Sequence, residues 1–198
     1  MRRLVLCRHG EAQGVAGRFC GAFDPPLSAE GRRQAERLAA AFREFVVCTS
    51  PARRALETAR VITPEPIVDP DLREIDFGEA DGLTHDEAAA RWPDLYGEWL
   101  SAPTEVCFPG GEPFADFRAR VLSALERIDR DAVVVTHAGV IRTALAHWLA
   151  MPDEALFRID QGHGAVSVVD WLEGTPVVRR VNCPPGDAIL GAWRARRS

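Results

Sequence analysis

The chain has 198 residues, of which 46% are hydrophobic and 27% charged, and its formal net charge is -5. These values fit one compact domain with a buried core and give no reason to expect nucleic-acid binding or attraction to a membrane surface. Because no apolar stretch is long enough for a membrane span or a secretory signal, we expect a cytoplasmic protein.

Two features of the composition limit the chemistry. The five cysteines are an odd number, widely spaced and without a Cys-x-x-Cys pair, so we expect neither a disulfide framework nor a zinc site. All 24 basic residues are arginine, since the chain contains no lysine. Any anion site must therefore use guanidinium groups, which bind phosphate in a bidentate geometry.

Strand and helix signals alternate in the first part of the chain. Residues 4–7 form an apolar run that predicts a buried strand ending just before His9. Ser28 is typical of a helix N-cap, and apolar residues follow it at helical spacing. Residues 45–49 predict a second buried strand. The Ser-Pro pair at 50–51 then predicts a helix with serine at the N-cap and proline at the first helical position.

Residues 78–112 interrupt this alternation. Thr84 and Glu87 have the spacing of a capping box for a short helix, and aromatic residues followed by a Pro/Gly-rich loop come after them. We expect a substrate-capping excursion within a single domain that spans residues 1–198. The alternative is an ordinary connection with a small core of its own.

The alternation then resumes. Residues 114–128 have the apolar spacing of a long amphipathic helix, residues 132–136 predict a buried strand, and another helix follows directly. Residues 165–181 predict a hairpin that turns near Gly174. Strands alternating with helices predict a three-layer α/β/α sandwich around a mostly parallel central sheet.

Two histidines follow predicted buried strands directly, His9 after the first and His137 after residues 132–136. Because the carboxyl ends of parallel strands line one crevice, we expect the two rings to meet there. Arg8 adjoins the first histidine, and Arg54 lies in the first turn of a helix that also follows a strand. The helix that starts near Gly139 offers free N–H groups to an anion. Together these groups predict a receptor for a phosphoryl group.

The charges indicate a reaction type. Neighbouring arginines disfavour protonation of His9, so its imidazole can attack phosphorus and form a phosphohistidine. The guanidinium groups of the arginines and His137 can stabilise the transition state without a metal or another cofactor. The leaving alcohol needs a proton donor. Glu74 is the best candidate for it, and Asp76 and Glu79 remain alternatives on spacing alone.

Each of these residues also has a structural interpretation. Arg54 considered alone is typical of an exposed helix surface. We interpret His85, His147 and His163 as structural or solvated residues. The combination of groups carries the functional prediction, not any one of them.

Five segments of the chain resemble, in the same order, motifs of the histidine phosphatase superfamily, which has the phosphoglycerate-mutase-like fold. These segments are LCRHGE (6–11), PLSAEG (26–31), TSPARRALETA (49–59), LREIDFG (72–78) and VTHAGVIR (135–142). The resemblance implies a fold, a reaction on small-molecule phosphate esters, and a set of site residues.

The implied catalytic residues are His9 as phospho-acceptor, Glu74 as proton donor, and His137. The implied phosphate pocket is formed by Arg8, Arg54 and His137. We add Gln13 and Ala138 as phosphate-binding candidates at two positions where the sequence departs from the family pattern. Arg54 is selected over its neighbour because the family's arginine directly precedes the alanine matched by Ala55. Gln13 stands near the position where many members carry a phosphate-contacting asparagine, and Ala138 stands where many carry glycine.

The segment FRIDQG (157–162) is similar to the cobalamin-pathway branch of the family. That branch removes the 5'-phosphate of α-ribazole phosphate or of the corresponding cobalamin phosphate. Three alternatives remain open: a broad-specificity phosphatase or phosphoglycerate-mutase-like enzyme, a degenerate phospho-ligand binding module, and a metallohydrolase. The last would use His9, His137 and Glu74 as ligands, and the adjacent arginines would repel a dication.

Overall fold

The structure is a computed structural model that describes residues 2–186. Six strands form one sheet in the order β3-β2-β4-β1-β5-β6. The strands are β1 (Arg2–Arg8), β2 (Val47–Thr49), β3 (Ile67–Val68), β4 (Ala132–Thr136), β5 (Val166–Leu172) and β6 (Thr175–Cys183). The α-helices are α1 (Ala29–Phe42), α2 (Arg53–Ile62), α3 (His85–Arg91), α4 (Pro93–Ser101), α5 (Phe114–Arg127) and α6 (Ala138–Trp148).

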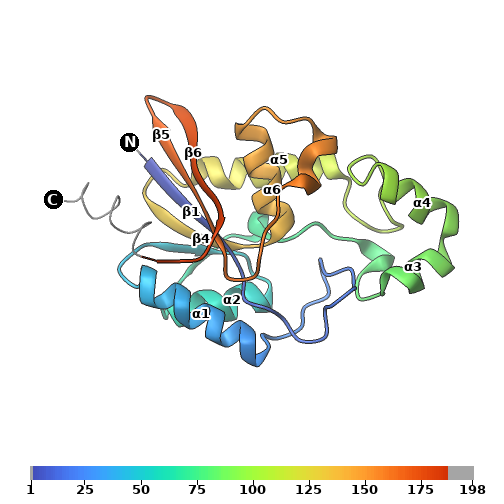
Figure 1. The fold of residues 1–198 in the computed structure, drawn as a ribbon, viewed down its shortest axis with the longest axis horizontal. Helices are drawn as coiled ribbons and strands as arrows, with labels where there is room; N and C mark the ends of the chain where they lie inside the picture. Colours follow the sequence, from blue (N-terminus) through green and yellow to red (C-terminus); the bar gives the residue numbers. More distant parts are fainter. Residues whose placement is uncertain (1, 187–198) are drawn as a thin grey trace.

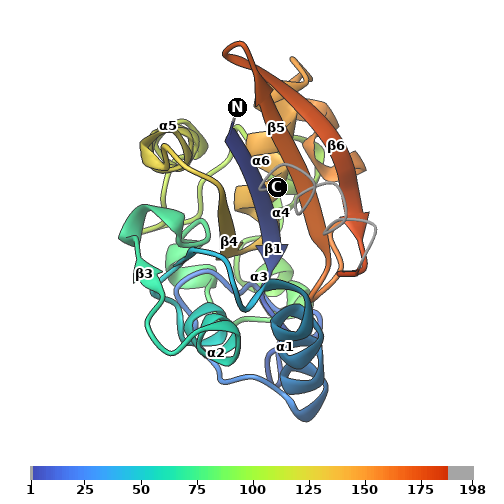
Figure 2. The same ribbon diagram turned by 90° about the vertical axis from the view of Figure 1, so that its left-hand side faces the viewer.

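The sheet is parallel over its first four strands. β3 pairs with β2, β2 with β4 and β4 with β1, each in parallel. The predicted hairpin then adds β5 antiparallel to β1 and β6 antiparallel to β5, so β5 runs opposite to the other five strands of the sheet. Figure 2 shows β4, β1, β5 and β6 side by side in this order. The prediction of a mostly parallel central sheet is confirmed.

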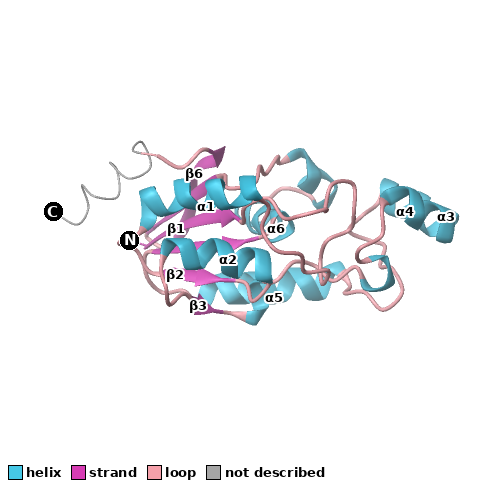
Figure 3. Ribbon diagram, turned by 90° about the horizontal axis from the view of Figure 1, so that it is seen from below, coloured by secondary structure: helices cyan, strands magenta, loops and turns pink. Residues whose placement is uncertain are grey.

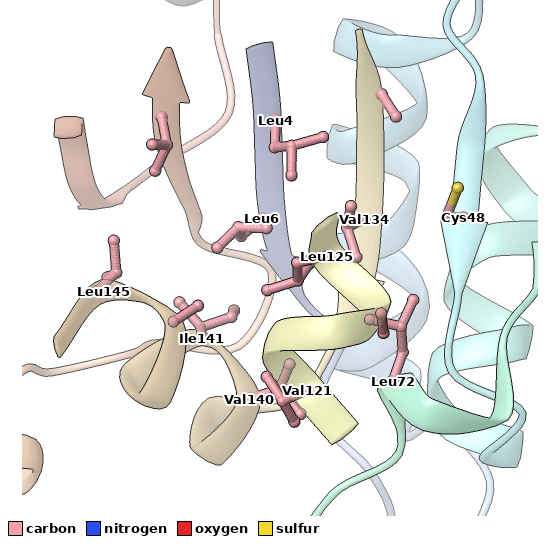
Figure 4. Close-up of a cluster of buried hydrophobic side chains, with 14 of the residues drawn as sticks. Leu4, Leu6, Cys48, Leu72, Val121, Leu125, Val134, Val140, Ile141 and Leu145 are labelled. Atoms are coloured by element: carbon pink, nitrogen blue, oxygen red, sulfur yellow. The ribbon is translucent and has the colours of Figure 1, made fainter. Parts of the chain in front are cut away.

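Helices cover both faces of the sheet and bury two apolar clusters. α1 and α2 pack on one face, where Leu38 and Phe42 meet Val5 of β1; they lie in front of the strands in Figure 3. α5 and α6 pack on the other face, and Figure 4 shows their side chains against Leu4 and Leu6. All five of these residues are completely buried. The predicted three layers are therefore present.

Residues 78–112 form an excursion with its own apolar cluster. α3 and α4 project from the end of the sheet, as Figures 1 and 3 both show. Phe19, from the loop after β1, packs there against Phe77, Trp99 and Phe108, with ring centroids 5.1–5.2 Å apart. Thr84 makes the predicted capping box at the start of α3. The structure contains the small core that the second alternative from the sequence expected, and the substrate-capping role of the excursion stays a prediction.

Two element boundaries differ from the sequence prediction. β2 starts at Val47, because the Phe45 amide instead closes the end of α1 on the Phe42 carbonyl at 3.2 Å. α2 starts at Arg53 and has no side-chain cap from its own N-cap residue. Its first amide donates to the Asp24 carboxylate at 2.7 Å, a distant group that no local signal reveals. None of the helices within residues 2–186 is both long and apolar enough to cross a membrane.

Candidate active site

The two histidines meet at the ends of neighbouring strands. β1 and β4 are parallel and in register up to Arg8 and Thr136, so the residues that follow them emerge side by side. The ring centroids of His9 and His137 are 5.0 Å apart, with the rings nearly edge to face. Both side chains are buried, His9 at 5% exposure and His137 at 0%. The predicted meeting of the two rings is thus present.

The hydrogen bonds of His9 define which nitrogen is available for attack. Nδ1 lies 2.7 Å from the Gly10 carbonyl oxygen, which can only accept, so Nδ1 carries the hydrogen. Nε2 therefore has the lone pair, and Nε of Arg54 lies 3.2 Å away. Burial, followed by the charges of Arg54 and Arg8, lowers the pKa of His9 well below its usual value. His9 is consequently a neutral imidazole with Nε2 unprotonated.

Arg54 is held in place by a loop from a distant part of the sequence. Its side chain is 1% exposed. Nη2 donates to the carbonyl oxygens of Cys20 and Gly21, both at 3.1 Å, and Nη1 donates to that of Phe23 at 2.9 Å. Because its other donors are occupied, the guanidinium presents Nε to His9 in a single orientation.

The loop at residues 20–23 is itself held by hydrogen bonds to Asp81, a residue that the sequence analysis did not identify. The Asp81 carboxylate accepts from the amides of Gly21, Ala22 and Phe23 at 2.6–3.1 Å. It also accepts from the amide of Phe77 at 2.9 Å, close in sequence to Glu74. Asp81 thus joins the loop that orients Arg54 to the segment that carries the candidate proton donor. Nothing in the local sequence distinguishes this carboxylate from other surface aspartates.

His137 is oriented by Ser50, whose Oγ lies 2.8 Å from its Nε2. Burial and the charge of Arg54 lower the pKa of His137 well below the ordinary value. Its buried Nδ1 has no hydrogen-bond partner among the described residues. The sequence prediction that Ser50 is the N-cap of the next helix is wrong, because α2 begins three residues later with Ala52 at its N-cap. The Ser50 hydroxyl contacts the histidine and also accepts from the Ala52 amide at 3.2 Å.

Arg8 adds a second guanidinium beside the pair. Its Nη1 donates to the Gln161 carbonyl, while its buried Nε has no partner within the described chain. Burial lowers the pKa of Arg8 to about 10, with Glu74 acting in the opposite direction. The group therefore remains charged at neutral pH. An unpaired Arg8 N–H and the unpaired Nδ1 of His137 are available to ligand oxygens.

Glu74 reaches the start of α6. Its Oε2 accepts from the Gly139 amide at 2.9 Å, beside His137 in the chain. The expectation of free N–H groups at this helix start is corrected at Gly139, because the carboxyl group of Glu74 already accepts this N–H. A Cβ at residue 139 would lie 2.2 Å from Oε1 of Glu74, so only glycine allows the approach.

The two alternative carboxylates have other contacts. Asp76 accepts from the Gly78 amide at 2.8 Å within its own turn. Glu79 forms an exposed ion pair with Arg91 on α3. Of the three candidates, Glu74 is the one that is hydrogen-bonded to a residue close to His137 in the chain, Gly139.

The remaining candidates are less closely tied to the pair. Ala138 is the first residue of α6 and is buried at 8% exposure. Gln13 lies exposed on the loop after β1, where its amide donates to the Leu27 carbonyl at 3.2 Å. His163, which we interpreted as structural or solvated, lies beside His9, with ring centroids 5.5 Å apart. Nothing in the spacing of His163 marks this position.

Two clefts adjoin Glu74. One, of about 210 Å³, has a mixed lining that includes Asp24, Arg73 and Asp76. The other, of about 100 Å³, is mainly apolar and aromatic, and Arg142 of α6 adds a charge to its wall. Its aromatic lining residues are Phe77, Trp99, Phe114, Phe117 and Phe157. Within residues 2–186, no group of three or more His, Cys, Asp or Glu side chains is placed to hold a metal ion.

Fold and site together define a class of protein: an α/β sandwich in which two neutral histidines and two arginines gather at parallel strand ends beside a carboxylate. The family model of the histidine phosphatase superfamily (branch 1) matches residues 4–184. The chain belongs to this superfamily.

Relatives with assigned names agree with this class. The chain is 32% identical to an adenosylcobalamin/alpha-ribazole phosphatase of Salmonella typhimurium, covering 91% of this chain and 96% of that protein. It is 30% identical to phosphoserine phosphatase 1 of Hydrogenobacter thermophilus, and the match covers 98% of this chain and 100% of that protein. A crystal structure of a putative alpha-ribazole-5'-P phosphatase from Escherichia coli superposes with a TM-score of 0.85 at 28% identity, covering 94% and 98%.

Other relatives are longer. The chain is 35% identical to a bifunctional protein of Mycobacterium tuberculosis over 91% of its own length, yet it spans only 53% of that protein. Family membership places the chain in a superfamily whose relatives with assigned names include phosphatases.

Proposed function

We propose that the chain is a metal-independent phosphomonoesterase that transfers the phosphoryl group of its substrate to Nε2 of His9 and then to water. The observation that carries this proposal is the state of His9. Its ring is neutral, Nδ1–H is bound to the Gly10 carbonyl, and Nε2 is presented to Arg54. A nitrogen lone pair held in this way is a nucleophile that needs no separate base.

The group formed by Arg8, His9, Arg54 and His137 is called the phosphoryl end of the site. The charge that develops on the transferring oxygens would be stabilised by the positive charges of the two guanidinium groups and by hydrogen bonds from Arg8 and His137. If Ser50 donates its hydroxyl hydrogen to Nε2 of His137, the hydrogen on Nδ1 faces the ligand oxygens. We keep Gln13 and Ala138 as further phosphate contacts in this proposal.

Glu74 and the two clefts beside it are called the alcohol end. As the P–O bond of the ester breaks, the leaving oxygen takes a proton from Glu74 and departs as an alcohol. Water then attacks the phosphohistidine and gives a proton to Glu74, which releases phosphate and restores both residues. This carboxylate therefore acts as acid in the first step and as base in the second.

For the substrate we propose the 5'-phosphate of α-ribazole or of the corresponding cobalamin. The relatives named for these substrates support it, and so does the aromatic cleft, since a flat base can stack on aromatic side chains. The five cysteines are free thiols, which suits a cytoplasmic, reducing location.

A turnover screen tests this substrate. The purified chain would be assayed with α-ribazole phosphate, phosphoserine, sugar phosphates and nucleotides, and kcat/KM would be compared. We expect the highest value for α-ribazole phosphate. A higher value for phosphoserine would move the assignment to the other named branch. Similar values for all esters would favour the broad-specificity alternative, and no turnover of any ester would favour a binding module.

A further inference from the structure

A third imidazole adjoins the histidine pair and has no part in the function proposed above. The ring of His163 lies 5.5 Å from that of His9, tilted by 49°, and His9 lies 5.0 Å from His137. Three histidines from three separate segments of the chain are therefore grouped at the end of β1.

The backbone holds His163 at this position. The amide of Gly164 donates to the carbonyl oxygens of Arg8 at 3.1 Å and His9 at 3.3 Å. Gly164 has a φ of +69°, and a Cβ there would lie 2.9 Å from Cβ of Gln34 on α1. Because the next residue is bonded to the end of β1 and closely packed against α1, His163 is kept beside His9.

The side chain of His163 has an unused nitrogen. Its Nε2 is buried and has no hydrogen-bond partner within residues 2–186. Buried polar atoms are nearly always paired, so an unpaired nitrogen next to the candidate nucleophile calls for a functional explanation.

Charged and titratable groups face His163 from the neighbouring elements. Arg8 and His9 lie at the end of β1, Glu11 lies on the loop after it, and Arg54 lies on α2. Burial, and then the charge of Arg8, lower the pKa of His163 to about 4, while Glu11 acts in the opposite direction. In the free enzyme at neutral pH this ring is uncharged.

We propose that His163 is the third histidine of the phosphoryl end and takes up a proton when a phosphoryl dianion arrives on or next to His9. The proposal rests on the proposed function in one respect, the arrival of that group at His9. Two negative charges offset the field of Arg8 and Arg54, and the protonated ring then stabilises the anion. One proton is taken from solvent as the dianion arrives and is returned as phosphate leaves.

The size of this effect follows from the separation. A unit charge pair at 5–6 Å and an effective protein dielectric near 20 shifts an equilibrium by on the order of a hundredfold. Loss of the His163 imidazole should weaken binding of a dianion by up to this factor near pH 4 and much less at alkaline pH.

Sulfate is the probe for the test, because it stays a dianion across the relevant pH range, so any proton taken up on binding is bound by the protein and not by the ligand. Isothermal titration calorimetry in two buffers of different ionisation enthalpy counts the protons taken up. We expect wild-type protein to take up more protons than H163Q, by a difference that approaches one. Wild-type affinity should also rise more steeply as pH falls toward 4, by up to about tenfold per pH unit more than in the variant.

H163N is a second variant that removes the titrating ring without adding bulk, and H147Q is the matched control, since His147 is exposed on α6. H147Q should behave as wild type. Equal proton uptake in wild type, H163Q and H163N would overturn the inference, and so would a wild-type protein that does not bind sulfate. If phosphohistidine is trapped but proton uptake is equal in wild type and both variants, only this inference is refuted. If proton uptake depends on His163 but no phosphohistidine forms, only the proposed mechanism is refuted.

Discussion

The phosphoryl end and the alcohol end of the site are built from different parts of the fold. The phosphoryl end lies at the ends of two parallel strands and in the first turn of α2, and its two histidines and Arg54 are almost fully buried. The alcohol end is formed by loops, the excursion at residues 78–112 and the exposed face of Phe157. In the proposed function, the strand ends therefore supply the phosphoryl chemistry, and the loops and helices that line the clefts supply substrate choice.

The two ends are nevertheless mechanically joined. Asp81 binds the loop that orients Arg54 and also binds the amide of Phe77, which lies on the excursion side. Glu74 belongs to the alcohol end but is held by the amide of Gly139 next to His137. The following predictions separate the two ends, from the largest expected effect to the smallest.

Loss of the nucleophile should remove the function of the phosphoryl end altogether. We expect H9A to reduce kcat/KM by on the order of 10⁴–10⁶-fold, as in enzymes that lose a covalent nucleophile. Wild-type protein quenched during turnover should carry acid-labile, base-stable phosphate, and H9A should carry none. Substantial activity in H9A would show that the buried histidine is not the phospho-acceptor.

Loss of the proton donor should depend on the leaving group. We expect E74Q to slow phosphorylation by an alkyl phosphate by roughly 10²–10⁴-fold, and by an aryl phosphate much less, because a nitrophenolate leaves without a proton. Single-turnover measurement is required, since Glu74 also serves the water-attack step and could mask the difference at steady state.

D76N and E79Q are the matched controls for Glu74, because their carboxylates are bound to Gly78 and Arg91. Neither should show the leaving-group dependence. An equal loss for both esters in E74Q would mean that Glu74 positions the phosphate. Dependence at Asp76 or Glu79 instead would move the proton donor to that residue.

Acid should lower the free energy of unfolding through the buried histidines of the phosphoryl end. Burial and neighbouring arginines keep the pKa values of His9 and His137 well below 6.5, whereas the unfolded chain protonates both rings below about pH 6.5. The unfolded state then binds more protons, so stability is full above this pH and falls below it. The expected loss is up to about 1.4 kcal/mol per pH unit for each histidine.

Urea denaturation between about pH 7.5 and pH 5.5 measures this slope. H137Q should reduce the pH dependence of the free energy of unfolding, and H147Q should leave it as in wild type, because His147 is exposed. A slope that is the same in all three proteins would show that the acid response comes from other groups.

Substrate choice should respond to the aromatic cleft. Phe157 lines the cleft but is 52% exposed, so its truncation need not disturb the core. We expect F157A to raise KM for α-ribazole phosphate roughly 2- to 10-fold, the range of one aromatic contact, with little change for phosphoserine. L149A, which truncates a comparably exposed side chain outside the cleft, is the control. An equal change for both substrates would remove the cleft from base recognition.

Chelation should have the smallest effect. Guanidinium groups and His137 supply the positive charge that a metal would otherwise provide, so activity should be unchanged after treatment with EDTA. Loss of activity that a divalent metal ion restores would favour the metallohydrolase alternative at both ends of the site.

Local signals predicted much of the fold. Ser28 caps α1 and Thr84 caps α3 as expected, since a cap and its partner amide lie within three residues of each other. Ser50 shows the limit of such signals. The same Ser-Pro pattern predicted a cap, but the hydroxyl bonds to His137, 87 residues away, and the distant Asp24 binds the first amide of the helix instead.

The sequence by itself determined the order of the longer strands and helices, without β3 and α4, and grouped His9, Arg8, Arg54 and His137 as one candidate site. This was possible because apolar runs mark buried strands, and residues that follow parallel strands share one edge of the sheet. Only the tertiary structure decided which groups orient them. The carbonyls that hold Arg54, the carboxylate of Asp81 and the ring of His163 act across distances in the sequence that no spacing encodes. Their contacts depend on where the folded loops lie, since a hydrogen bond is selected by position in space and not by separation along the chain.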